Sequence, residues 1–160
     1  MIRVVLTVLV AVALLAAAMP ALESARATTT AERLDTEADR VERAVGRLVA
    51  DSVSVANPSL AARTTVTVRV PSGFGAAPID RVALAETDEV SEGDTAGADV
   101  ALRYRIDGGS ERSVPIAPGG VDATVAVDGE AIALRPGGES RLVLRLVDDG
   151  GPTVRIGRVG

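Results

Sequence analysis

The N-terminal part of the chain is continuously apolar, and this pattern predicts a membrane-spanning helix. Val4 to Leu22 is interrupted only by Thr7 and Pro20. As a helix rising about 1.5 Å per residue, this stretch is about 28 Å long, close to a bilayer hydrocarbon thickness of about 30 Å. Arg3 is the only charged side chain before it, so the positive-inside bias places the N-terminus in the cytoplasm and everything after the stretch outside. We therefore predict a transmembrane anchor over residues 1–22.

The same segment also has the features of a cleaved secretion signal. Arg3 supplies a short basic region, Val4 to Ala18 an apolar region, and Ala25-Arg26-Ala27 an A-x-A cleavage pattern. The length of the apolar stretch favours a retained anchor, whereas the A-x-A pattern favours cleavage after Ala27. We expect a single-pass protein of the cell membrane with an extracellular C-terminal domain; the alternative is a signal peptide that ends at residue 27.

Beyond the apolar stretch, apolar residues recur at alternating steps of three and four. This spacing predicts an amphipathic helix over residues 23–57, with arginines and carboxylates on its other faces. Its packing seam comprises Ala31, Leu34, Ala38, Val41, Val45 and Leu48. Thr29 and Glu32 fit a capping box that would begin a new helix after the three threonines, in competition with one continuous rod. A seam of this kind serves either a coiled coil or a contact with a sheet of the same chain, and we predict the sheet.

After the amphipathic segment the apolar period changes to two, which predicts a β-rich domain over residues 62–160. Thr65 to Val70 alternates, and turn sequences separate seven or eight such short stretches. We expect Pro115 to restrict its strand to a sheet edge or a bulge, and the apolar residues on both faces of 141–147 to place that strand centrally. Asp128-Gly129 predicts a type I′ hairpin. The fold class is therefore α+β: an N-terminal transmembrane helix runs into an amphipathic helix that packs on a C-terminal antiparallel β-sheet or sandwich.

Composition excludes most catalytic chemistry and nucleic-acid binding. The chain contains no histidine, cysteine, lysine or tryptophan. Ser-His-Asp and Cys-His catalysis, zinc sites of the usual nitrogen and sulfur type, Ser-Lys dyads and P-loops therefore cannot form. The net charge of −5 argues against a nucleic-acid partner, which requires a basic surface. Because high salt screens a dense acidic surface, an acidic, arginine-rich and lysine-free composition predicts a salt-adapted, haloarchaeal source.

Carboxylates are the remaining candidates for chemistry, and we interpret them as solvated surface. They are Glu86, Asp88, Glu89, Glu92 and Asp94 in one loop, and the pair Asp148-Asp149. The loop lacks the calcium-loop pattern, and a chain whose only aromatic residues are Phe74 and Tyr104 has few platforms for a sugar. We predict no catalytic residue, cofactor, metal site or small-molecule substrate. Arginines that alternate along strands are expected to cover one sheet face, where an acidic partner could bind: Arg103, Arg105, Arg141, Arg145, Arg155 and Arg158.

The segment "LLAAAMPALESAR", followed by a charged helical stretch to about residue 55 and a β-rich remainder, resembles the type IV pilins and pseudopilins. That resemblance implies one long helix whose outer half packs on a sheet and whose inner half serves as membrane anchor and filament core. It also makes Pro20 the counterpart of the helix-kinking proline of the family. Only Met1-Ile2-Arg3 precede Val4, in place of the family's basic leader, and the early acidic residue of many pilins is missing. The chain is also similar in layout to short uncharacterised haloarchaeal proteins.

These observations predict a protein that acts through protein contacts and is not an enzyme. We expect a pilin-like, membrane-anchored extracytoplasmic component of a surface filament or secretion system, with other pilin-like or secretion-system proteins as partners. The alternative is an exported β-sandwich binding or adhesion module released by signal peptidase after Ala27.

Overall fold

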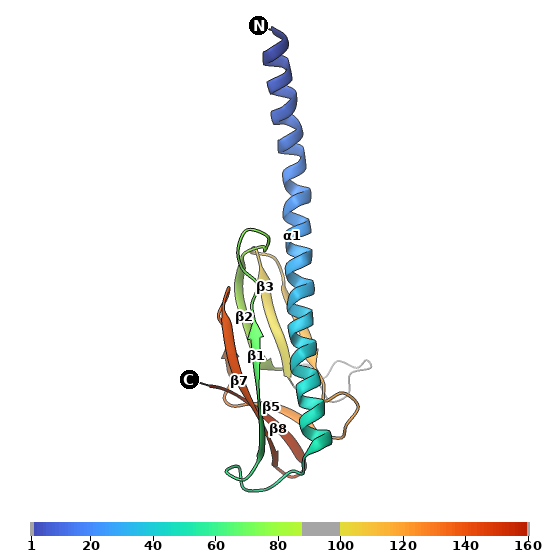
Figure 1. Cartoon of the computed structure of the whole chain (residues 1–160), viewed down its shortest axis with the longest axis vertical. Coiled ribbons are helices and arrows are strands. Elements are labelled where there is room, and N and C mark those ends of the chain that lie inside the picture. Colours follow the sequence, from blue (N-terminus) through green and yellow to red (C-terminus); the bar gives the residue numbers. More distant parts are fainter. Residues whose placement is uncertain (1, 88–99, 160) are drawn as a thin grey trace.

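A single long helix runs beside a β-sandwich in the computed structural model of the chain, which describes residues 2–87 and 100–159 (Figure 1). Helix α1 spans Ile2–Asp51 and is followed, within the described residues, by eight strands. The strands are β1 (Ala62–Arg69), β2 (Ile79–Glu86), β3 (Val100–Ile106), β4 (Glu111–Ile116), β5 (Thr124–Val127), β6 (Ala131–Ala133), β7 (Glu139–Asp148) and β8 (Pro152–Arg158). The predicted α+β class is confirmed.

Helix α1 is continuous, so no new helix begins after the three threonines. It passes through Pro20 without ending there. Thr28 donates its hydroxyl to the Ser24 carbonyl oxygen at 3.0 Å, and Thr36 donates to the Glu32 carbonyl oxygen at 2.9 Å. These bonds to the preceding turn satisfy the threonine hydroxyls within a continuous helix.

The predicted end of the helix near residue 57 is wrong, because α1 ends at Asp51. Beyond Asp51 the chain pairs with the sheet. Val55 forms a parallel bridge with Val147, and the Val55 carbonyl oxygen accepts the Asp148 N–H at 3.1 Å. The alternation of serine and valine over residues 52–55 is a strand pattern, and it overrides continuation of the helix.

The strands form two four-stranded sheets, in the orders β1-β7-β8-β5 and β4-β3-β2-β6. Of the two architectures that the sequence allowed, the sandwich is therefore the one that forms. Strand β7 lies inside its sheet and β4, which contains Pro115, lies at an edge, as predicted. The expectation of purely antiparallel sheets is wrong for one pair, because β5 and β8 are parallel.

The type I′ hairpin predicted at Asp128-Gly129 does not form. Strand β5 pairs with β8 in one sheet and β6 pairs with β2 in the other, so this turn crosses between the layers. Gly129 has a positive φ of 99°, but Asp128 does not, and a type I′ turn needs both. The turn that joins β3 to β4 does have a positive φ at both central residues, Asp107 (50°) and Gly108 (66°). In this turn the Gly109 N–H donates to the Ile106 carbonyl oxygen at 2.9 Å.

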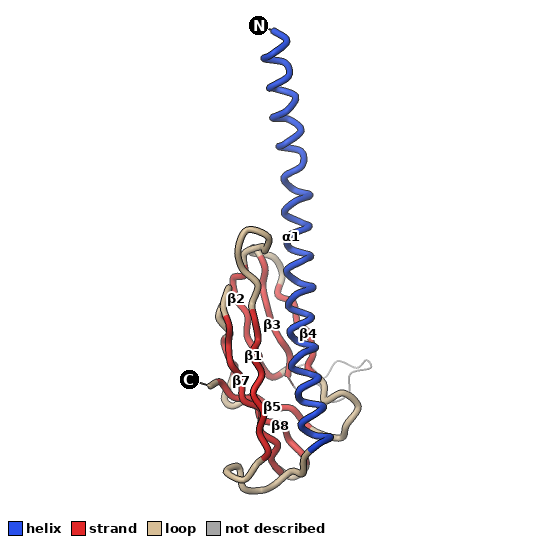
Figure 2. The backbone as a smooth tube through the Cα atoms, viewed as in Figure 1, coloured by secondary structure: helices blue, strands red, loops and turns tan. Residues whose placement is uncertain are grey.

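The C-terminal half of α1 lies along the open side of the sandwich (Figure 2). It contacts β1 and β4, which are the edge strands of the two sheets on that side. The helix thereby covers two rows of backbone groups that would otherwise be unpaired, which is one of the ways in which proteins protect sheet edges. Its seam joins the inward-facing residues of both sheets in one hydrophobic core.

Candidate functional site: the exposed helix and its junction with the sandwich

The N-terminal half of α1 is apolar and exposed. Its large apolar side chains, from Ile2 to Leu22, are between 49% and 85% exposed. Within the part of the chain that the structure describes, α1 is the one helix long and apolar enough to cross a membrane, and none of its apolar window is buried by the protein. A contiguous exposed apolar surface of this kind marks a site of contact with lipid or protein, which makes this half of α1 a candidate membrane anchor.

The C-terminal half of the same helix is part of the domain core. All six residues of the predicted packing seam are buried: Ala31, Leu34, Ala38, Val41, Val45 and Leu48. Leu34 and Val45 are fully inaccessible to solvent. Each buried Leu or Val contributes roughly 1.5–3 kcal/mol, so the seam fixes the helix to the sandwich, and an exposed rod projects from a rigid base.

The base of the exposed rod is tied to the loop between β1 and β2. The hydroxyl oxygen of Thr30, which is fully buried, accepts the Ala77 N–H at 2.9 Å. One turn earlier, the guanidinium carbon of Arg26 lies 4.9 Å from the centroid of the Phe74 ring, the distance of a cation–π contact. The Phe74 side chain is 92% exposed. The loop therefore holds an exposed aromatic ring beside the point where α1 leaves the domain.

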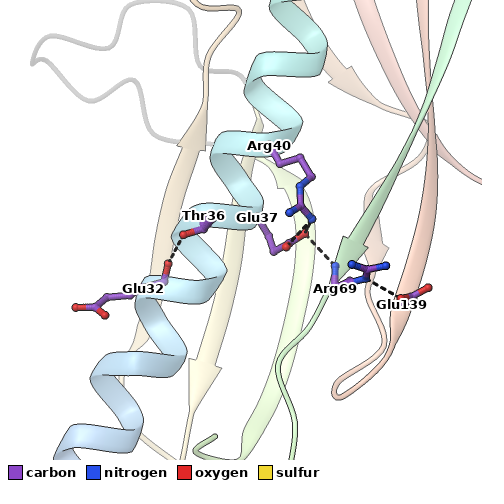
Figure 3. Close-up of polar contacts among 6 residues, drawn as sticks. All are labelled: Glu32, Thr36, Glu37, Arg40, Arg69 and Glu139. Atoms are coloured by element: carbon purple, nitrogen blue, oxygen red, sulfur yellow. Dashed lines mark hydrogen bonds and ion pairs between the residues drawn. The ribbon is translucent and has the colours of Figure 1, made fainter.

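Glu37 connects α1 to the edge of β1 (Figure 3). Its carboxylate accepts the backbone N–H of Arg69 at 3.0 Å, and it accepts the Arg40 guanidinium at 2.7 and 2.8 Å. Arg69 in turn donates its Nε to Glu139 at 2.7 Å. That contact raises the pKa of Arg69, first through the hydrogen bond to Glu139 and then through its charge. Glu37 is only 8% exposed, and its principal task is to satisfy an edge-strand donor that no neighbouring strand reaches.

Tyr104 makes a second polar contact between the helix and the sandwich. Its hydroxyl donates to Asp35 at 3.2 Å, and its ring is buried in the core. Burial raises the pKa of the Tyr104 phenol, and the nearby negative charge of Asp35 raises it further. Both effects oppose the phenolate, so the contact is that of a structural hydrogen bond and does not create a reactive base.

The arginines expected to share one sheet face lie on both sheets, so that prediction is wrong. Arg103 and Arg105 belong to β3, whereas Arg141, Arg145, Arg155 and Arg158 belong to β7 and β8. Arg63, Arg145 and Arg155 lie side by side on three neighbouring strands of one sheet. Asp149 accepts the Arg155 Nε at 2.7 Å, which raises the pKa of that guanidinium.

The candidate carboxylates that lie among the described residues do not gather into a cluster that could hold a metal ion. Asp88, Glu89, Glu92 and Asp94 of the acidic loop lie outside those residues, and Glu86 is exposed at the end of β2. Asp149 faces Arg155, and no three His, Cys, Asp or Glu side chains in the described ranges gather closely enough to hold a metal ion. Three hollows lined by described residues measure about 240–350 Å³ and are open to solvent.

The expectation that Glu37 belongs to the solvated carboxylates on the other faces of the helix is wrong, because it is only 8% exposed. No sequence pattern singles out Thr30, Arg26 or Phe74 as contact residues. Glu37 and Thr30 each immediately precede an alanine of the seam, which puts them at the flank of the apolar stripe; a polar residue there is a candidate for bonding to the neighbouring sheet edge. Phe74 is the only phenylalanine of the chain and lies in a glycine-rich turn. Its closeness to Arg26 depends on the return of β1 alongside α1, which no local pattern encodes.

The comparisons with known proteins identify a family without an assigned activity. A family model described as "Domain of unknown function (DUF7311)" matches residues 1–159. No curated protein and no solved structure matches the chain.

Proposed function

The chain belongs to the DUF7311 family, and from the geometry of its helix we propose that it is a single-pass membrane protein with a cytoplasmic N-terminus and an extracellular β-sandwich. In this proposal the protein is a pilin-like structural or assembly component of a surface filament or secretion system. It acts by contact with other proteins and not by catalysis.

One observation carries the proposal: a single unbroken helix has an exposed apolar half and a buried amphipathic half. The exposed half, residues 2–22, has the length and hydropathy of a bilayer span. The buried half leaves no hinge between span and domain, because Thr30 and Ala31, close beyond the apolar stretch, are already part of the domain's interior. Such a protein holds its domain at a fixed height and direction above the membrane.

The pilin-like role is supported by the division of α1 into an exposed apolar half and a half that packs on the sandwich. In the type IV pilin plan, the part of the helix that lies outside the domain anchors the protein and then packs against other copies in a filament. The exposed half of α1 offers that kind of surface, since small alanines occur among leucines and a valine over residues 11–22. The acidic, lysine-free composition supports a salt-adapted, haloarchaeal source for such a surface protein.

Membrane fractionation with a matched charge variant tests the anchor. The full chain is expected in the membrane fraction after an alkaline carbonate wash. Leu14→Arg places a charge near the middle of the span, at a cost of about 2.5–3.5 kcal/mol, and should move protein out of that fraction. Leu60→Arg, at a position 74% exposed on the sandwich, is the control and should leave the distribution unchanged. Recovery of the unaltered chain in the wash would contradict the anchor.

Cross-linking tests assembly separately, because the chain contains no cysteine. Leu9→Cys introduces one thiol in the exposed half of α1, and Leu60→Cys one on the sandwich. If copies of the chain form a filament, membranes that contain the double variant Leu9→Cys/Leu60→Cys should give a ladder of disulfide-linked oligomers. The ladder is expected because the same contacts repeat from copy to copy. A membrane-embedded protein that stays monomeric under these conditions would leave the anchor intact and refute the pilin-like role.

The alternative function, an exported sandwich released after Ala27, is favoured by one feature of the core. The buried residues of α1 begin at Thr30, so a chain cut before Thr28 would keep the whole packing seam. Against it, Ala25 and Ala27 lie inside the unbroken helix, whose backbone would have to open for cleavage. The mass of the mature N-terminus distinguishes the two.

A further inference from the structure

The loop between β1 and β2, residues 70–78, lies at the end of the sandwich from which α1 projects (Figure 1). From Pro71 to Pro78 this loop contains no charged residue, in a chain in which 24% of residues are charged. At its centre Phe74 is flanked by Gly73 and Gly75, and its side chain is 92% exposed. The loop is thus an apolar tip that points away from the core of its own domain.

The position of this loop along α1 sets its height above the span. Arg26 lies four residues beyond Leu22, the last apolar residue of the span, which corresponds to about 6 Å along the helix. The polar headgroup layer on each side of a bilayer is roughly 5–7 Å thick. Because Arg26 contacts the Phe74 ring, with 4.9 Å from guanidinium carbon to ring centroid, an anchored helix brings that ring to the headgroup layer.

The chemistry of the pair suits this layer. Aromatic rings concentrate at membrane–water interfaces, where one face of the ring meets acyl chains and the other meets polar groups. An arginine at the same level can place its guanidinium among lipid phosphates while its methylenes remain in contact with apolar surface. The Thr30–Ala77 hydrogen bond, buried and 2.9 Å long, fixes the loop to the helix and so keeps the ring at this height.

On these grounds we infer that the β1–β2 loop is a second membrane contact, in which Phe74 inserts into the outer interface of the bilayer beside Arg26. The inference rests on the proposed membrane anchor. With two points of contact, the span and the loop, the tilt of the sandwich against the membrane plane is restrained, so the end of the domain that carries the loop stays toward the bilayer.

Other exposed apolar side chains of the sandwich supply the control. Val53 and Leu60, 81% and 74% exposed, follow the C-terminal end of α1, at the opposite end of the domain from the exposed helix. Their height puts them far from the bilayer, although their exposure is comparable with that of Phe74. Exposure alone therefore does not predict lipid contact, and the two ends of the domain can be compared directly.

Single-tryptophan variants test the inference, because the chain contains no tryptophan. The full chain is reconstituted in phosphatidylcholine–phosphatidylglycerol vesicles as Phe74→Trp, Leu14→Trp or Leu60→Trp. Bromine is carried either near the glycerol end or near the methyl end of the acyl chains. Phe74→Trp should emit at shorter wavelength than Leu60→Trp. Brominated lipids should quench its emission, and bromine near the glycerol end should quench it more strongly than bromine near the methyl end. Leu14→Trp should be quenched more strongly by bromine near the methyl end, and Leu60→Trp by neither.

The three variants separate the loop from the anchor. If Leu14→Trp is quenched and Phe74→Trp behaves as Leu60→Trp does, the anchor stands and the loop contact is refuted. Blue-shifted but unquenched emission from Phe74→Trp would assign the ring to a contact with protein, and this also overturns the inference. Unquenched Leu14→Trp would overturn both the proposed anchor and the loop contact that depends on it.

Discussion

Replacement of Glu37 tests how α1 is attached to the sandwich. Glu37→Ala removes the acceptor of the Arg69 backbone N–H, at 3.0 Å, and the partner of the Arg40 guanidinium. Strand β1 is the edge of its sheet, so no strand replaces the lost acceptor. Leaving a donor without a partner at a partly buried site costs about 1–3 kcal/mol, toward the lower end where water can reach the donor. The Arg40 side chain is 43% exposed, and the ion pair adds at most about 1 kcal/mol.

Two further variants separate the edge-strand bond from the ion pair. Glu37→Gln keeps a side-chain oxygen that can accept the Arg69 N–H but loses the charge, so its free energy of unfolding should fall by less than about 1 kcal/mol. Arg40→Ala removes only the ion pair and should have an equally small effect. Glu37→Ala should therefore be clearly the least stable of the three variants.

Urea unfolding of the full chain in detergent, followed by circular dichroism, measures these differences. With an m-value of about 1–3 kcal/mol/M, a loss of 2 kcal/mol lowers the midpoint by roughly 0.7–2 M. Because salt screens the exposed ion pair but not the backbone bond, the deficit of Glu37→Ala should persist at high salt. If Glu37→Gln or Arg40→Ala proves as unstable as Glu37→Ala, the charge and not the edge-strand bond holds the contact, and the reasoning fails.

Three other predictions follow from the same contacts. Leu34→Ala should lower the free energy of unfolding by about 3 kcal/mol, since Leu34 is fully buried in the seam; a denaturation midpoint unchanged from the parent would contradict its place in the core. Gly137→Ala should cost about 1–2 kcal/mol, because φ is +69° there and the new Cβ would lie 2.9 Å from the Ser72 Cβ; thermal unfolding measures this, and full stability would argue against that backbone conformation. Ultraviolet titration of Tyr104, the only tyrosine, should give a phenol pKa above 10, reduced in Asp35→Asn. Because the folded chain holds the phenol proton to higher pH than the unfolded chain, the contribution of Tyr104 to the free energy of unfolding is present below about pH 10 and is lost as pH rises through the folded pKa. Tyr104→Phe should not show this loss of stability at high pH. A phenol pKa at its ordinary value would contradict the buried contact with Asp35.

The fold class could be predicted because its signals are local. A period of 3.6 gives the helix and its buried stripe, a period of two gives the strands, and Pro115 marks an edge. The errors concern competition between distant segments. Asp128-Gly129 has hairpin chemistry, but β5 and β6 gain more by pairing with β8 and β2 in separate sheets. The predicted continuation of the helix beyond Asp51 likewise gives way to the bridge between Val55 and Val147.

The polar contacts at the junction could not be predicted for the same reason. Their partners are far apart in the chain: Thr30 bonds Ala77, and Glu37 bonds Arg69. A sequence pattern places each side chain on a helix flank, but the sheet edge that it meets follows from the strand order. The apolar span needs no such information, since every residue in it contributes to the same local signal.

The retention of the apolar helix in the mature protein is the central claim, and the intact mass of the protein from washed membranes tests it most directly. We predict a polypeptide that retains the apolar span ahead of Thr28 and is found in the membrane fraction. A mature protein that begins at Thr28 and is recovered from the medium would contradict the anchor, the pilin-like role and the lipid contact of Phe74 together.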